Sequence, residues 1–185
     1  MRHHSTATNL LECTHDWIVG LSNGNNIDVV YIDFTKAFDS IVFSKLLSKL
    51  NQYGIEGNLL SWLSSFIHGR TQRVVVENCF SSISEVVSGV PQGSVLGPIL
   101  FLIFINDIVS TCCGNTTVKL FADDLKLYSI YNSDDGVLNL QQSVDRLVHW
   151  SKIWQLNFNL SKCHVLPIRN RSKSTNNTQH TYLLD

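Results

Sequence analysis

The sequence has few charged residues, cysteines and prolines, and it lacks an apolar run long enough to cross a membrane. Only 16% of its 185 residues are charged, and it holds 5 cysteines and 3 prolines. The odd cysteine count and the absence of any C-x-x-C pair argue against a disulfide framework and a zinc knuckle. The most apolar stretch, residues 95–109, includes Gly97, Pro98, Asn106 and Asp107 and predicts a buried helix. These absences favour an intracellular protein (cytoplasm and/or nucleus) with no membrane partner.

The overall charge gives no sign of a polyanionic partner. Lys and Arg number 14 against 15 Asp and Glu, so the formal net charge is −1. A nucleic-acid function therefore has to be argued from motifs rather than from total charge. The hydrophobic fraction of 44% is high enough to bury a core. The length suits one domain or part of a larger one.

Hydrophobic spacing predicts a mixture of helices and strands. A continuous apolar strand is predicted over residues 27–34, and strand character flanks the aspartates within residues 118–128. Two further strands joined by a short turn are expected in residues 71–89. Helical spacing occurs over residues 7–21, 44–54, 58–69, 95–109 and 134–154. This order predicts an α+β fold, a split βαβ-like layout with helices packed on a sheet.

Three aspartates stand where predicted strands end. Asp33 closes the strand IDVVYIDF, and Asp123 and Asp124 separate the two strands of LFADDLKLY. If these strands are neighbours, the carboxylates repel one another unless a cation neutralises them. A hard divalent ion with oxygen ligands, above all Mg²⁺, suits that task. We expect Asp33 and Asp123 to share one metal, although residue types alone favour a solvated turn for Asp123 and Asp124 and an ordinary surface acid for Asp33.

A glycine-rich loop, GVPQGSVLGP, occupies residues 89–98 and precedes a predicted helix. Gly93 would let a nucleotide or a nucleic-acid strand approach the backbone closely. Gln92 offers an uncharged donor and acceptor suited to a base or sugar edge. Taken alone, the stretch favours an ordinary loop and N-cap ahead of a helix.

Three blocks occur in a fixed order: YIDFTKAFDSI, SGVPQGSVLGPILFLIFINDI and LFADDLKLY. Together they resemble the palm motifs of reverse transcriptases from non-LTR, LINE-type retrotransposons of the jockey-like kind. HHSTATNLLE and WQLNFNLSKCHVL also resemble segments of those enzymes. The resemblance implies a reverse-transcriptase palm, a small antiparallel sheet with packed helices, with partial fingers and an absent thumb. Residues 1–168 would form the palm region bordering the fingers, and 169–185 a polar C-terminal segment truncated before the thumb.

The resemblance also implies a metal centre. Asp33, Asp123 and Asp124 match the catalytic, metal-binding aspartates of the family, with Asp123 as the firmer ligand of the adjacent pair. The backbone carbonyl of Phe34 would complete the ligand set. Two Mg²⁺ ions, with Mn²⁺ as a possible substitute, would assist attack of a primer 3′-hydroxyl on the α-phosphate of an incoming nucleotide.

Further residues match the nucleotide side of the family site. Phe38 resembles a steric gate against a 2′-hydroxyl, with a core phenylalanine as the alternative reading. Gln92 and Gly93 would line the nucleotide and template side. Lys162 matches a family lysine near the phosphates that serves as general acid, with a solvated lysine as the alternative.

The implied function is an RNA-directed DNA polymerase domain fragment. Its partners would be an RNA template, a DNA primer and dNTPs, while the oligomeric state stays open. One alternative is a non-catalytic truncated remnant of such an element. Another is a maturase-type relative that shares the palm chemistry.

Overall fold

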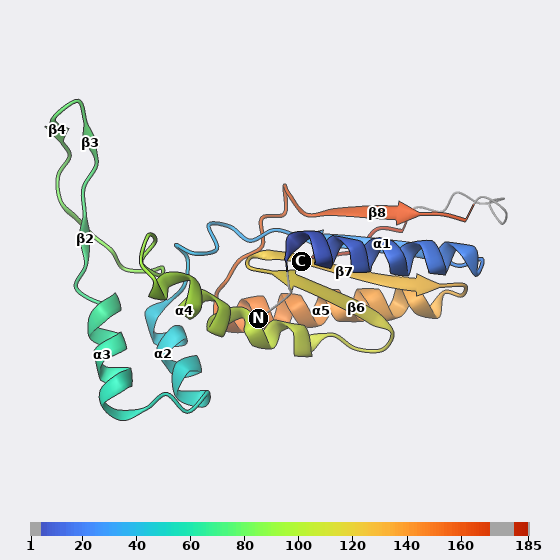
Figure 1. Ribbon diagram of the computed structural model, residues 1–185, viewed down its shortest axis with the longest axis horizontal. Helices are drawn as coiled ribbons and strands as arrows, with labels where there is room; N and C mark the ends of the chain where they lie inside the picture. Colours follow the sequence, from blue (N-terminus) through green and yellow to red (C-terminus); the bar gives the residue numbers. More distant parts are fainter. Residues whose placement is uncertain (1–4, 171–179, 185) are drawn as a thin grey trace. The chain divides into compact units, whose positions relative to one another are not determined.

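The computed structural model describes residues 5–170 and 180–184. The chain divides into two compact units, which are described separately (Figure 1). The first unit comprises residues 1–34, 107–153 and 157–185, and the second comprises residues 35–106 and 154–156.

An antiparallel sheet of four strands forms the centre of the first unit. The strand order is β6-β7-β1-β8, and every neighbouring pair is antiparallel. β1 lies inside the sheet and is apolar enough to be buried on both faces, since Ile27, Val29 and Val30 are at most 1% exposed. The strands are β1 (Asn26–Ile32), β6 (Thr116–Phe121), β7 (Asp124–Tyr131) and β8 (His164–Ile168).

Two helices cover opposite faces of this sheet. A Cβ atom on Gly20 of α1 (Thr6–Ser22) would lie 2.8 Å from Ile130 Cγ2, so this helix packs on the face that carries Ile130. Gly136, in the first turn of α5 (Asp135–Trp154), lies against Tyr131 on the other face. Because side chains alternate along a strand, the even-numbered residues of β7 face α1 and the odd-numbered ones face α5.

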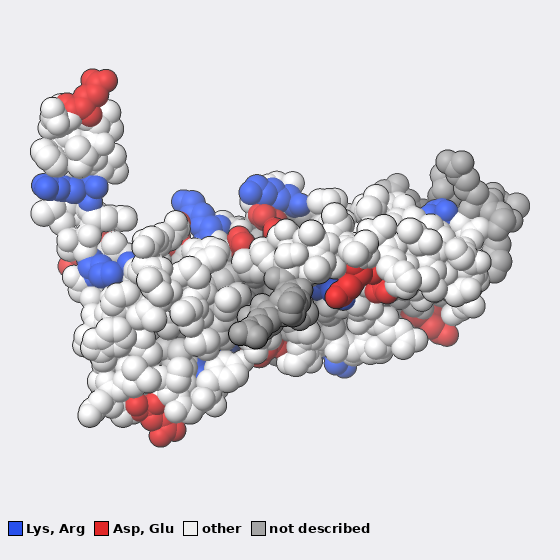
Figure 2. Space-filling model, viewed as in Figure 1, with Lys and Arg blue, Asp and Glu red and all other residues white. Residues whose placement is uncertain are grey.

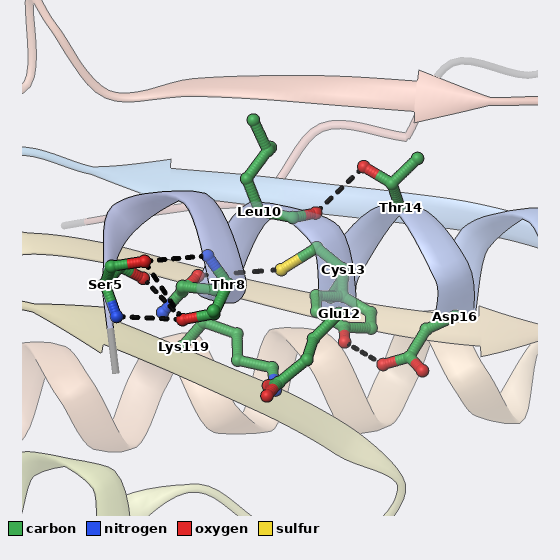
Figure 3. A network of polar contacts seen from close by, with 10 residues as sticks. Ser5, Thr8, Leu10, Glu12, Cys13, Thr14, Asp16 and Lys119 are labelled. Atoms are coloured by element: carbon green, nitrogen blue, oxygen red, sulfur yellow. Dashed lines mark hydrogen bonds and ion pairs between the residues drawn. The ribbon is translucent and has the colours of Figure 1, made fainter. Parts of the chain in front are cut away.

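Polar contacts fasten α1 to the strands beneath it (Figure 3). Ser5 caps the helix. Its side chain accepts a hydrogen bond from the Thr8 backbone N–H, and the Thr8 hydroxyl accepts one from the Ser5 backbone N–H. Further along the helix, Glu12 accepts from Lys119 of β6 at 2.6 Å, and Asp16 accepts from the Tyr128 hydroxyl of β7. These contacts lie on the face of the sheet that also carries Asp124.

A buried carboxylate ties the C-terminal residues to the sheet. Asp28 is fully buried, pairs with Arg169, and accepts from the Tyr131 hydroxyl at 3.0 Å and the Tyr182 hydroxyl at 2.7 Å. Burial raises the pKa of both tyrosines, and the neighbouring Asp28 raises it further, so both remain donors. The described residues of segment 169–185 thus contribute to the first unit. The domain boundary at 168 stays a prediction, and residues 171–179 lie outside the described residues.

Three helices form the body of the second unit: α2 (Phe43–Gln52), α3 (Gly57–Ile67) and α4 (Leu96–Ile105), which the 3₁₀ helix η1 (Asn106–Thr111) follows. α2 packs against both α3 and α4. Lys49 of α2 is buried, donates to the Phe104 carbonyl, and places its ammonium 4.0 Å from the centre of the Trp154 ring. The bond to the Phe104 carbonyl joins α2 to α4, and the cation–π contact adds Trp154 to this packing.

A long hairpin projects from the second unit (Figure 1). The two strands expected here are each broken, so that two small sheets form, β2 with β5 and β3 with β4. No packed core lies beneath these strands, all of whose residues are exposed, so nothing imposes one continuous ladder. The strands are β2 (Thr71–Gln72), β3 (Val75–Val76), β4 (Cys79–Phe80) and β5 (Ser84–Glu85).

The α+β prediction is confirmed, including the small antiparallel sheet and the five predicted helices, whose ends shift by a few residues. The sequence did not predict β8, because this segment contains Pro167 and proline argues against a strand. The structure explains its place there, because β8 is an edge strand, where proline is tolerated. In the described part of the chain, no helix combines the length and the apolarity needed to cross a membrane.

Truncating a core residue of α5 tests the packing of the first unit. Leu147 is fully buried, so we expect Leu147→Ala to lower the free energy of unfolding by about 2–5 kcal/mol. Leu138 of the same helix is 60% exposed, and Leu138→Ala should change it by no more than about 0.5 kcal/mol. Urea denaturation followed by circular dichroism measures both. Equal losses in the two variants would contradict the packing of α5 on the sheet.

Candidate active site

Asp33 and Asp124 meet at one end of the central sheet. β1 pairs with β7 so that Ile32 lies opposite Leu125, which places the residue after β1 beside the first residue of β7. The expectation that these strands are neighbours is therefore confirmed. Both aspartates line one pocket of about 320 Å³. The pocket is formed by Tyr31, Ile32, Asp33, Asp124, Leu125, Lys126, Lys162 and His164.

Asp123 lies in the turn that joins β6 to β7. Phe121 pairs with Asp124, which leaves Ala122 and Asp123 as a two-residue loop. Ala122 adopts a φ of +51°, in the left-handed region that tight hairpin turns require. Such a conformation is unfavourable for a residue with a Cβ atom, and strain of this kind concentrates at functional sites.

The three aspartates are not arranged as a complete ligand set. No group of three or more His, Cys, Asp or Glu side chains in the described part of the chain is placed to hold a metal ion. Asp33 shares its pocket with Asp124 rather than with Asp123. The shared metal of Asp33 and Asp123, and the order of the two adjacent ligands, therefore stay predictions.

The immediate surroundings of Asp33 favour a cation. Its Oδ2 atom is buried and accepts no hydrogen bond from the residues that the structure describes, although the Lys162 ammonium lies 3.6 Å away and the side chain as a whole is 35% exposed. A buried acceptor without a donor is costly, and a cation removes that cost. Together with Asp124 in the same pocket, this oxygen supplies the hard donor type that Mg²⁺ and Mn²⁺ accept. The donor type at Asp33 and Asp124 thus suits a divalent ion.

Residues after α5 hold the backbone around Asp33. The Asn159 N–H donates to the Asp33 carbonyl at 2.8 Å, and the Asp33 N–H lies 3.4 Å from the sulfur of Cys163. Burial raises the pKa of the Cys163 thiol. Phe34 is buried and forms an isolated bridge with Phe158, whose ring lies 5.3 Å away.

A second pocket, of about 230 Å³, lies in the second unit and contains three of the predicted nucleotide-binding residues. Phe38 stacks on Phe101 at 4.1 Å between ring centres, and its remaining surface lines the pocket beside Gln92 and Gly93. Phe38 is half-buried, so it packs against the core and also faces the pocket. Gly93 adopts a φ of +79°, and nothing lies within 4 Å of where its Cβ atom would stand.

Backbone hydrogen bonds align the two segments that build this pocket. The Gly89 N–H donates to the Ile41 carbonyl at 2.8 Å, and the Val90 N–H donates to the Phe38 carbonyl at 2.9 Å. The Gln92 amide donates to the Asp39 carboxylate at 2.6 Å. Asp39 was not predicted to take part, since no sequence signal links residues 53 positions apart. This hydrogen bond engages the Nε2 end of the Gln92 amide and orients the side chain.

Comparison with known proteins agrees with these motifs. Residues 1–183 match the family model described as "Reverse transcriptase (RNA-dependent DNA polymerase)". The chain belongs to the reverse transcriptase family. It is 29% identical over 182 residues to the RNA-directed DNA polymerase from mobile element jockey of Drosophila melanogaster, covering 92% of this chain and 19% of that protein. It is 30% identical over 175 residues to the probable RNA-directed DNA polymerase from transposon BS of the same fly, covering 86% and 18%.

Two telomerase structures with low sequence identity to this chain share its fold. A telomerase from Candida albicans, in complex with a TWJ fragment of telomeric RNA, aligns with a TM-score of 0.69 at 15% identity. The alignment covers 96% of this chain and 31% of the telomerase chain. Apo telomerase from Candida tropicalis, truncated from its C-terminal domain, aligns with a TM-score of 0.62, covering 89% and 35%. These likenesses confirm the palm-type fold, and the chain spans less than a fifth of the length of the two curated relatives described above.

Two glycines of the reverse transcriptase loop offer a matched test of its close packing. Both have positive φ, but a Cβ atom on Gly89 would lie 2.6 Å from Asp39 Cα, whereas one on Gly93 meets open space. We expect Gly93→Ala to cost about 1 kcal/mol for the left-handed backbone alone, and Gly89→Ala about 2 kcal/mol more for the overlap. Chemical denaturation of both variants measures the difference, and equal costs would contradict the alignment of the loop with residues 38–41.

Proposed function

We propose that this chain is the palm of an RNA-directed DNA polymerase, which extends a DNA primer with dNTPs on an RNA template. The observation that carries the proposal is the pocket shared by Asp33 and Asp124 at the ends of neighbouring strands, in a member of the reverse transcriptase family. A short, rigid junction between paired strands is well suited to holding carboxylates in a fixed position.

The acidic residues would act by holding charge. Asp33 and Asp124, joined by Asp123 from the adjacent turn and by the Phe34 carbonyl, would hold two Mg²⁺ ions, with Mn²⁺ as a substitute. Divalent ions at such a site activate the attacking hydroxyl and neutralise charge on the transferred phosphate. The chain itself would contribute positioning, since phosphoryl transfer depends mainly on alignment and charge neutralisation.

The remaining predicted residues would bind the nucleotide. Phe38 would pack against the sugar and reject a 2′-hydroxyl, because its ring is fixed by the stack on Phe101. Gln92 would hydrogen-bond a base or sugar edge, and Gly93 would leave room for the backbone of the ligand. Lys162, which lines the pocket of Asp33 and Asp124, would meet the phosphates and serve as general acid.

An RNA template, a DNA primer and an intracellular location are part of the same proposal. The five cysteines are all free thiols, as expected of a reducing compartment. Figure 2 shows Lys and Arg interspersed with Asp and Glu on the face drawn, without one broad basic patch. Because the formal net charge of the chain is −1, we expect its own binding of nucleic acid to be weak and sensitive to salt.

Primer extension on an RNA template tests the proposal. With Mg²⁺ and dNTPs we expect templated incorporation by the wild-type chain, and a rate lower by at least about 100-fold in Asp33→Asn and Asp123→Asn. Asp145→Asn is the matched control, since Asp145 is an exposed acid of α5, on the opposite face of the sheet.

Equal extension by the wild type and the two site variants would overturn the assignment of the aspartates. Absence of incorporation by the wild-type chain would contradict the polymerase proposal for this chain. That result would instead favour the alternative of a non-catalytic remnant.

Removing the aromatic ring of Phe38 tests the steric gate. We expect Phe38→Ala to raise incorporation of ribonucleotides relative to deoxynucleotides by about 10-fold or more, because the ring no longer excludes the 2′-hydroxyl. The control is Phe80→Ala on the hairpin, where the side chain is 59% exposed. Single-nucleotide incorporation kinetics give both ratios. An unchanged ratio in Phe38→Ala would leave Phe38 as a packing residue only.

A further inference from the structure

Lys162 forms an ion pair with the aspartate that is proposed to bind metal. Its Nζ atom lies 3.6 Å from Oδ2 of Asp33, and the two side chains are 66% and 35% exposed. That oxygen is buried and accepts no hydrogen bond among the described residues. The ammonium group of Lys162 is therefore the positive charge that faces it.

We propose that Lys162 is a built-in counter-cation for Asp33 that has to leave before a divalent ion binds there. The inference rests on the proposed function, because it takes Asp33 as a metal ligand. An ammonium group and a divalent ion cannot both sit against one carboxylate oxygen, since two positive charges a few ångströms apart repel strongly. Lys162 thus competes with the metal for Asp33, in addition to its proposed contact with phosphate.

The local structure allows this exchange without unfolding. The backbone at Lys162 is held in a turn, where its N–H donates to the Asn159 carbonyl at 2.9 Å and the Cys163 N–H donates to the same carbonyl at 3.1 Å. The side chain is long and mostly exposed, so the ammonium group can swing into water while the turn stays in place. The same turn holds Asp33, through the Asn159 N–H bond to its carbonyl.

The pocket also supplies a matched control. Lys126 of β7 lines the same pocket, and no ion pair joins it to a carboxylate in the described ranges 5–170 and 180–184. Replacing either lysine with glutamine removes one positive charge from the pocket, but only the change at Lys162 removes the competitor for Asp33. The two variants thus separate specific pairing from the general charge of the pocket.

Titration of the purified chain with Mn²⁺, followed by electron paramagnetic resonance, tests the inference without any requirement for activity. At constant pH and ionic strength we expect Lys162→Gln to lower the Kd for Mn²⁺ by about two- to sixfold, the range that an exposed ion pair can oppose. Lys162→Arg keeps the charge and should stay near the wild-type value. Lys126→Gln should change the Kd by less than Lys162→Gln. Asp33→Asn should abolish Mn²⁺ binding both in the wild type and in Lys162→Gln. Circular dichroism is used to check that each variant is folded.

The possible outcomes separate the inference from the function on which it rests. The role of Lys162 would be overturned if the Kd for Mn²⁺ were unchanged or higher in Lys162→Gln, or if Lys126→Gln lowered the Kd by the same factor. Either result would leave the metal role of Asp33 intact. Binding that does not depend on Asp33, in the wild type and in Lys162→Gln alike, would contradict the proposed metal site and this inference with it.

Discussion

The antiparallel pairing of β1 with β7 is the constraint on which the proposed metal site depends. β1 is buried on both faces between α1 and α5, and a slip of one residue would carry the buried carboxylate of Asp28 away from Tyr131 and Arg169 and into the apolar cluster under α1. That register sets Ile32 opposite Leu125 and brings Asp33 beside Asp124. A shift of one residue would turn Asp124 towards the face covered by α5. The hydrophobic core of the first unit therefore also specifies the geometry of the acidic pocket.

The pocket carries a local cost that the surrounding structure offsets. A buried carboxylate oxygen without a hydrogen bond and an alanine at positive φ are both unfavourable, and both stand at the sheet end that holds the aspartates. Elsewhere in the same sheet, the buried carboxylate of Asp28 is fully satisfied by Arg169, Tyr131 and Tyr182. The contrast indicates that the sheet is stabilised away from the pocket, where Oδ2 of Asp33 faces only the mostly exposed side chain of Lys162 among the described residues. Lys162 makes that acceptor tolerable when no divalent ion faces it.

The second unit builds its pocket by a different means. Backbone bonds from Gly89 and Val90 join the loop to residues 38–41, and the missing Cβ atom of Gly89 permits that approach. The pairing brings Phe38, Gln92 and Gly93 to the lining of one pocket, although the loop itself has no regular structure. These three residues could be identified from the sequence because they occupy matching positions in the family motifs. The hydrogen bond that orients Gln92 could not be predicted, since Asp39 and Gln92 are distant in sequence and make this bond only once the chain is folded.

The family, the α+β class, the positions of the five helices and the candidate aspartates can all be read from the amino-acid sequence, because hydrophobic periodicity and ordered motifs are local properties of the chain. Tertiary structure decided which carboxylates share a pocket, that Lys162 faces Asp33, and that a proline-containing segment joins the sheet as its edge strand. It also decided that the hairpin strands break where no core supports them. These outcomes depend on strand order and side-chain direction, which arise from contacts between residues far apart in sequence.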